Sequence, residues 1–133
     1  MNAGSLTVDG QASGLFTGIT SEAIAGSTGN AGSVEATTKG SLTLANGAVI
    51  SSSTYGAGKA GSVKVNADSI SIDGKATAAG VPAGGSQGSS KDTPSSISAS
   101  ALAGSSGQTG SVVVAASDRI ALSNGGNIAI TND

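Results

Sequence analysis

The chain contains a displaced copy of its own sequence pattern. Residues 19–55 match residues 97–133 without a gap, at a constant offset of 78 positions. Glycines and aliphatic residues recur at the same places, as in the pairs Ile19/Ile97, Gly29/Gly107, Gly32/Gly110, Val34/Val112, Leu44/Leu122, Asn46/Asn124 and Ile50/Ile128. Such a regular self-match indicates a structure built by stacking a repeated unit, in which most positions serve the stacking rather than a unique active site.

Shorter repeat spacings occur within the 78-residue offset. The tetrapeptide Ala31–Val34 recurs 29 residues later as Ala60–Val63, and Leu6–Gly10 recurs 64 residues later as Ile70–Gly74. The offset then grows from 64 to 78, so 14 additional residues lie after Gly74 and before the last copy. Units that carry Asp-Gly therefore alternate along the chain with units that carry Asn-Gly.

The composition restricts both the core and the function. The 133 residues suit a single domain, but they include 22 glycines, only 2% aromatic residues and no His, Cys or Trp. An ordinary compact core would be poorly filled, whereas a chain that closes backbone hydrogen bonds between like turns needs less apolar volume. Disorder is the alternative, but the net charge of −2 and the regularly spaced aliphatic residues disfavour it. Scattered basic residues argue against nucleic acid as a partner, and no apolar run approaches the roughly 20 residues of a membrane span.

The aliphatic residues alternate with period two, which is typical of β-strands. They form three families of short segments: Val34–Ala36, Val63–Val65 and Val112–Val114; Leu6–Val8, Leu42–Leu44, Ile70–Ile72 and Ile120–Leu122; and Ile19–Ala23, Ile50–Thr54, Ile97–Ala101 and Ile128–Ile130. Segments this short must pair with their repeat images, so one repeat makes one turn of a coil whose turns stack in parallel at about 4.8 Å. We therefore predict an all-β parallel β-helix, or β-solenoid, of about four turns with three short strands per turn. The second family should point inward in one stacked column. Hairpins at the Asn-Gly dipeptides are the alternative, although hairpins do not require matched repeats.

Glycine-containing dipeptides are predicted to form the corners. Asp-Gly and Asn-Gly supply the positive φ angles that a tight corner needs. We expect Asp9, Asn46, Asp73 and Asn124 on successive turns, where each amide donates a hydrogen bond to a neighbouring carboxylate. A second corner, before the first strand family, is marked by three sets of glycines: Gly26, Gly29 and Gly32; Gly56, Gly58 and Gly61; and Gly104, Gly107 and Gly110.

Residues 75–96 are the one stretch that departs from the repeat. They contain both prolines, Pro82 and Pro94, and a run of Gly, Ser and Gln that cannot continue a strand ladder. We expect a loop that protrudes from one corner of the domain formed by residues 1–133, and excision of residues 80–94 should leave folding intact. The long polar side chains Gln87, Lys91 and Asp92 make it a candidate partner contact, and the corner aromatic Tyr55 is a further candidate.

Three motifs together resemble a known family. They are the Ala-Gly-Ser-Val openings, the decapeptide Ser41–Ile50 (Ser-Leu-Thr-Leu-Ala-Asn-Gly-Ala-Val-Ile), and Ser53–Gly61 (Ser-Thr-Tyr-Gly-Ala-Gly-Lys-Ala-Gly). This order is similar to the repeat region of filamentous haemagglutinin-type exoproteins, the large secreted partners of two-partner secretion systems. The alternation of Ile-Asp-Gly with Asn-Gly-Ala units resembles the form common in cyanobacterial proteins of this type. The resemblance covers nearly the whole chain except the insertion.

The resemblance implies a right-handed parallel β-helix, export through an outer-membrane transporter, and adhesion to a host-cell, surface or glycan receptor. The secretion domain of the family carries Asn-Pro-Asn motifs, and this sequence has none. We therefore expect a segment of the structural or adhesive shaft of a large secreted bacterial surface protein, taken from inside the parent, rather than its secretion signal.

Catalytic and metal-binding constellations are not found in the sequence. Without His or Cys the usual triads and metal clusters are excluded, so we expect no enzyme activity, no metal and no cofactor. Paired acids could still act as in glycosidases, and the candidates are Asp9, Glu22, Glu35, Asp68, Asp73, Asp92 and Asp118. A β-helix that binds or cleaves polysaccharide is therefore the alternative function. We also expect end-to-end self-association, because the outermost strands of a stack are unpaired edges.

Overall fold

The computed structural model is all-β. It describes residues 1–10, 17–74, 95–102 and 105–132, and these contain no helix. The strands are β1 (Asn2–Ala3), β2 (Leu6–Asp9), β3 (Gly18–Ala23), β4 (Val34–Thr38), β5 (Ser41–Ala45), β6 (Val49–Thr54), β7 (Val63–Asp73), β8 (Ser96–Ala101), β9 (Val112–Ser123) and β10 (Asn127–Asn132).

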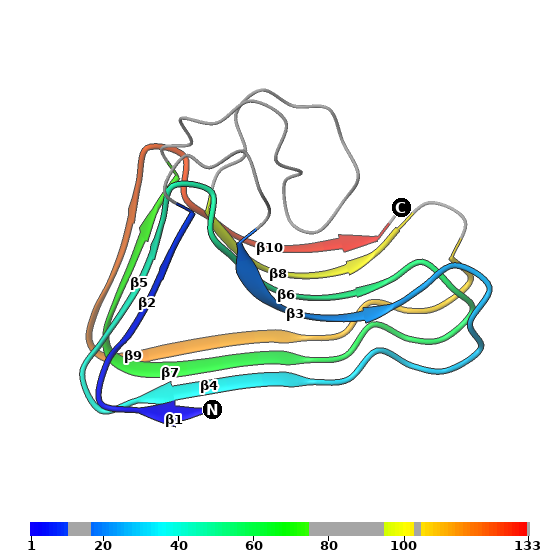
Figure 1. Cartoon of the computed structure of the whole chain (residues 1–133), viewed down its shortest axis with the longest axis horizontal. Helices are drawn as coiled ribbons and strands as arrows, with labels where there is room; N and C mark the ends of the chain where they lie inside the picture. Colours follow the sequence, from blue (N-terminus) through cyan, green and yellow to red (C-terminus); the bar gives the residue numbers. More distant parts are fainter. Residues whose placement is uncertain (11–16, 75–94, 103–104, 133) are drawn as a thin grey trace.

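The strands form two parallel sheets. A six-stranded sheet has the order β1-β4-β7-β5-β2 with β9 also paired to β7, and a four-stranded sheet has the order β10-β8-β6-β3. The larger sheet curls sharply: β1, β4 and the first halves of β7 and β9 form one arm, while β2, β5 and the second halves of β7 and β9 form the other (Figure 1). The smaller sheet lies across from the first arm (Figure 1). Every strand pair is parallel, which excludes hairpins among the described strands.

The pairing register is the one that the repeats predict. The registers are Val34↔Val63↔Val112 in the first family, Leu6↔Leu42↔Ile70↔Ile120 in the second, and Ile19↔Ile50↔Ile97↔Ile128 in the third. Period two is the reason, because a slip of one residue would turn every apolar side chain to the opposite face. The repeat images therefore lie beside one another although 28 to 50 positions of sequence separate them.

The first two strand families belong to one curled sheet instead of two separate sheets. In β7 and β9 the chain passes from one arm to the other without leaving the ladder. The register shifts between Ala67 and Ser69, whose partners are Ala116 and Arg119, so β9 carries one extra residue at the bend. An extra residue of this kind is a β-bulge, which bends a strand and increases its twist without ending the pairing.

The core is the space between the curled sheet and the smaller sheet. Leu42, Leu44, Ile70 and Ile72 are at most 1% exposed, as the inward column requires. Ile120 and Leu122 are in the same column but are 42% and 50% exposed, because β9 is the outermost strand and has no described strand on its far side.

Strands β6 and β8 of the smaller sheet are buried along their whole length, including the serines. Ser52 shows how a hydroxyl is satisfied there: its Oγ donates to the carbonyl oxygen of Gly32 at 3.0 Å and accepts from the backbone N–H of Gly61 at 2.9 Å. One small side chain thus ties the smaller sheet to the glycine corner of two adjacent repeats.

Candidate functional site

The Asn-Gly corners have the expected conformation and contacts. Asn46 and Asn124 have φ angles of 54° and 49°, and the following Gly47 and Gly125 have φ angles of 81° and 82°. The Nδ2 atom of Asn46 donates to Oδ1 of Asp9 at 2.6 Å, and Nδ2 of Asn124 donates to Oδ1 of Asp73 at 2.8 Å. The prediction that amides and carboxylates stack alternately at this corner is confirmed for both pairs.

The Asp-Gly corners differ from the prediction. Gly10 and Gly74 do not have positive φ angles. These two glycines allow the backbone of the neighbouring turn to come close. A Cβ on Gly10 would collide with the carbonyl oxygen of Asn46, and one on Gly74 would collide with the backbone nitrogen of Gly126. At this corner the left-handed residues therefore lie on the Asn-Gly side, and the glycines of the Asp-Gly side leave space for the backbone of the neighbouring turn.

The glycine-rich corner is a packed column of backbone. A Cβ on Gly58 would collide with the carbonyl oxygen of Gly29, and a Cβ on Gly107 would collide with that of Gly58. Beside this column the backbone N–H of Lys59 donates to Oδ1 of Asn30 at 2.8 Å. Because the backbones of successive repeats are in contact along this column, there is no space for a ligand between them.

Among the described acids, Glu35, Asp68 and Asp118 each have a partner that is not an acid. Glu35 lies 3.8 Å from Lys64 Nζ, and both side chains are more than half exposed, so the pair contributes little to stability. The hydroxyl of Ser117 donates to Asp68 at 2.9 Å, and Asp118 lies 4.0 Å from Arg119. In the described ranges no group of three or more His, Cys, Asp or Glu residues is arranged to hold a metal ion.

Tyr55 follows β6 and is partly buried. Its backbone N–H donates to the carbonyl oxygen of Ala23 at 2.8 Å. Burial and, to a smaller extent, the negative charge of Glu22 raise the pKa of the Tyr55 phenol above its ordinary value. Of the four predicted contact residues, the structure describes only this one; Gln87, Lys91 and Asp92 lie outside the described residues.

The end of the predicted insertion is corrected by two residues. Ser96 begins β8 and is buried, and the hydroxyl of Ser95 accepts a hydrogen bond from the backbone N–H of Gly47 at 3.2 Å. Both serines therefore belong to the stack. The prediction failed here because Ser-Ser alone gives no period-two signal before Ile97.

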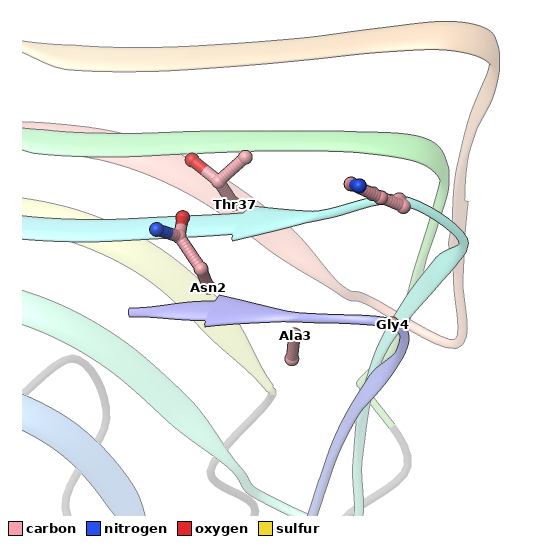
Figure 2. Close-up of a pocket in the computed structure, with 5 residues that line it drawn as sticks. Asn2, Ala3, Gly4 and Thr37 are labelled. Carbon is pink, nitrogen blue, oxygen red and sulfur yellow. The ribbon is translucent and has the colours of Figure 1, made fainter.

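A surface depression of about 530 Å³ lies at the outer edge of the six-stranded sheet. It is lined by Asn2, Ala3, Gly4, Thr37 and Lys39. The side chains of Asn2 and Thr37 extend to the same side of the adjacent strands β1 and β4, and that of Ala3 extends to the other (Figure 2). The described lining residues include one cationic side chain and no carboxylate, so they provide no acid–base pair, and we interpret the depression as the outer rim of an open sheet.

Comparison with known proteins gives no relative. No family model matches the chain, and no curated protein or solved structure is significantly similar to it.

The described residues also contain no helix that is long and apolar enough to cross a membrane. The features that remain are the stacked corners and the two outer edges of the sheets. The first edge consists of β1, β2 and β3, and the second consists of β9 and β10.

Proposed function

We propose that the chain is a non-enzymatic shaft segment of a large secreted bacterial surface protein, exported through an outer-membrane transporter. In this proposal the two parallel sheets are part of a right-handed parallel β-helix of about four turns with three short strands per turn. A shaft needs only that each turn supports the next, so its residues are expected to serve stacking rather than chemistry.

The in-register pairing of repeat images is the observation that carries the proposal. Leu42, Ile70 and Ile120 lie beside one another, as do Ile50 and Ile97. The carboxylates of Asp9 and Asp73 support the same view, because each accepts a hydrogen bond from an asparagine amide of the corner and so takes part in the stacking.

The adhesive part of the proposal places a receptor contact on the insertion and on Tyr55. A rigid stack carries variable side chains at its corners, where added residues do not interrupt the ladder. A cell-surface or glycan receptor is the expected partner. Gln87, Lys91 and Asp92 are the proposed contact residues of the insertion.

A binding and degradation assay separates the shaft from the polysaccharide-acting alternative. The whole chain, a variant lacking residues 80–94 and the variant Tyr55→Ala are coupled to beads and tested for adhesion to cells and to a glycan array. The proposal predicts no cleavage of any polysaccharide and adhesion that falls in one or both variants. Depolymerisation by the whole chain would replace the shaft with the enzymatic alternative, and adhesion unchanged in both variants would remove the proposed contact.

A further inference from the structure

The dipeptide Asn46-Gly47 contains both groups of a self-contained reaction. Glycine has no Cβ to hinder the approach, so its backbone nitrogen readily reaches the side-chain carbonyl carbon of a preceding asparagine. The bond between Gly47 N and Asn46 Cγ forms, the bond between Cγ and Nδ2 breaks, and ammonia leaves with the proton of the attacking nitrogen. Water then opens the cyclic imide at either of its carbonyl carbons, which leaves an aspartyl or an isoaspartyl residue. Water is the only co-reactant.

The attacking nitrogen is held by the repeat on one side. Asn46 and Gly47 are the central residues of a tight turn that is closed by the N–H of Ala48, which donates to the carbonyl oxygen of Ala45 at 3.1 Å. Gly47 is buried, and its N–H donates to Oγ of Ser95, which is 0% exposed and directly precedes β8. The attack requires this nitrogen to lose its proton and to turn its face toward Asn46 Cγ. The hydrogen bond to Ser95 opposes both steps.

The leaving nitrogen is held by the repeat on the other side. Nδ2 of Asn46 donates to Oδ1 of Asp9 at 2.6 Å, and Asp9 ends β2, which pairs with β5. Ser95 instead leads into β8, which pairs with β6. The nitrogen that attacks and the nitrogen that leaves are therefore bound by two different neighbouring repeats. All of these contacts join described repeats of the chain, so they do not depend on what precedes residue 1 or follows residue 133.

The product of the reaction does not fit the corner. Deamidation replaces the donor amide with a carboxylate that faces the carboxylate of Asp9, and like charges in contact repel each other. Strand β5 lies between β2 and β7 in the sheet, and β7 ends at Asp73, so a second carboxylate stands on the other side. The isoaspartyl product also adds a carbon to the backbone of the turn. Either product therefore opposes the return of the repeats to the stacked arrangement.

From these observations we propose that Asn46 is a deamidation site controlled by the stacking of its own repeats. While the repeats are stacked, Ser95 and Asp9 hold the two reacting nitrogens and the reaction is slow. When the repeats separate, both nitrogens are released, water reaches the peptide group and the imide forms. The reaction then makes the separation irreversible, so this corner converts a reversible opening of the stack into a lasting chemical change.

Peptide mapping by mass spectrometry follows the reaction at this site in the whole chain. Trypsin releases residues 40–59, in which Asn46 is the single Asn or Gln. The unaltered chain is incubated in mildly alkaline buffer with and without urea. Deamidation should be at least about tenfold slower in the folded chain, because it requires the small fraction of molecules in which the corner is open. Equal rates with and without urea would overturn the proposal.

Two serine substitutions test whether the control lies in the corner. Ser95→Ala removes the acceptor of the Gly47 N–H and should raise the deamidation rate of the folded chain about two- to tenfold, the usual effect of one lost hydrogen bond. Hydrogen exchange at the Gly47 N–H should accelerate by a similar factor. The control Ser96→Ala removes a buried hydroxyl that has no hydrogen-bond partner among the described residues, so both rates should stay unchanged. Circular dichroism establishes that each variant is folded, and equal effects of the two substitutions would contradict the assigned role of Ser95.

Asp9→Ala extends the test to the leaving amide, and its exposed position makes it the second variant if Ser95→Ala does not fold. It should also raise the rate, whereas the control Asp68→Ala, which removes an exposed carboxylate bonded to Ser117, should not. Chain that is deamidated in urea and returned to buffer should melt at a lower temperature than chain exposed to urea too briefly to react. The proposal fails if Asp9→Ala reacts no faster than Asp68→Ala, or if the deamidated product melts like the unreacted chain.

Discussion

At the tight corner, the Asn-Gly and Asp-Gly dipeptides have different roles. Asn46 adopts the left-handed conformation and donates its amide to Asp9, while Gly10 makes room for the carbonyl oxygen of Asn46. An Asn is suited to the first role because it tolerates positive φ and carries a donor. The alternation of Asp-Gly and Asn-Gly units is therefore a physical pairing of an acceptor with a donor.

Substitution of Asn46 separates these two contributions. Asn46→Gly and Asn46→Ala both lose the hydrogen bond to Asp9, but only alanine is strained at a φ of 54°. The free energy of unfolding of Asn46→Ala should be lower than that of Asn46→Gly by about 1–2 kcal/mol. Urea denaturation of the two variants measures the difference. Equal stabilities would mean that the left-handed conformation is not required at this corner.

Tyr55 gives a pH dependence that is simple to observe, because the chain has one Tyr and no Trp. Its folded-state pKa is raised above 10.0 by burial and by Glu22, so the phenol is protonated in both the folded and the unfolded state at neutral pH. As the pH rises past about 10 the unfolded chain ionises first, and stability is lost up to the folded-state pKa. Titration of the tyrosinate absorbance should give a midpoint above 10 that decreases in Glu22→Gln. The control Glu35→Gln, whose carboxylate lies beside Lys64, should leave it unchanged. A midpoint that does not respond to Glu22→Gln would contradict the assigned charge effect.

At the scale of the element, strand pairing and corner packing are coupled. Strands β4, β7 and β9 pair closely only if the backbone of the glycine corner also stacks, and there Gly29, Gly58 and Gly107 follow one another. A side chain at Gly58 meets the backbone of the preceding repeat at Gly29, so it pushes these two repeats apart. The cost is therefore expected to depend on the position of a glycine in the stack, not only on its backbone conformation.

Alanine substitution at two equivalent glycines tests this dependence. A Cβ on Gly58 meets the backbone of Gly29, whereas a Cβ on Gly29 meets nothing within 4 Å. Gly58→Ala should lower the free energy of unfolding by about 1–3 kcal/mol, as overpacking does, and Gly29→Ala should change it little. Chemical denaturation of both variants provides the comparison. A similar effect at both positions would show that the corner is looser than the structure indicates.

The strand registers could be predicted because period two and the repeat offset both fix them. Ile19, Ile50 and Ile97 are recognisable as images of one another from the sequence alone. The bulge at the bend of β9 could not be predicted, since the surrounding Ala-Ala-Ser-Asp sequence has no apolar alternation to reveal the extra residue. The burial of the serines in β6 and β8 also could not be predicted from the sequence, because serine is mostly an exposed residue and its burial depends on tertiary packing.

For the whole molecule, burial depends on the position of a strand in the stack. Leu44 and Leu122 are in one column, yet Leu44 is fully buried and Leu122 is half exposed. The sequence could predict the column but not this difference, because both residues have the same local pattern. The insertion was recognisable as a candidate contact only because its sequence departs from the repeat. Which strand lies at an edge depends on the order of strands in the assembled stack, so the local sequence does not reveal it.

Replacing each of these leucines by aspartate tests the difference. Leu44→Asp buries an unpaired charge inside the stack, which costs several kcal/mol and should unfold the chain. Leu122→Asp remains partly in water and should leave the chain folded with a lower melting temperature. Thermal melting followed by circular dichroism distinguishes the two. A Leu44→Asp variant that melts like the unaltered chain would show that this column does not point inward.

The parallel in-register stack is tested most directly by oxidative cross-linking of engineered cysteines, because the chain contains none of its own. Thr43 of β5 and Ser71 of β7 are register partners on adjacent strands. Strands at about 4.8 Å are within the Cα separations that disulfides accept, whereas a shift of two residues increases the separation to about 7–8 Å. Thr43→Cys with Ser71→Cys should form an intramolecular disulfide in the folded chain, detected by mass spectrometry after proteolysis, and Thr43→Cys with Ser69→Cys should not. Preferential bonding of the second pair, or equal bonding of both, would contradict the register and with it the stacked architecture.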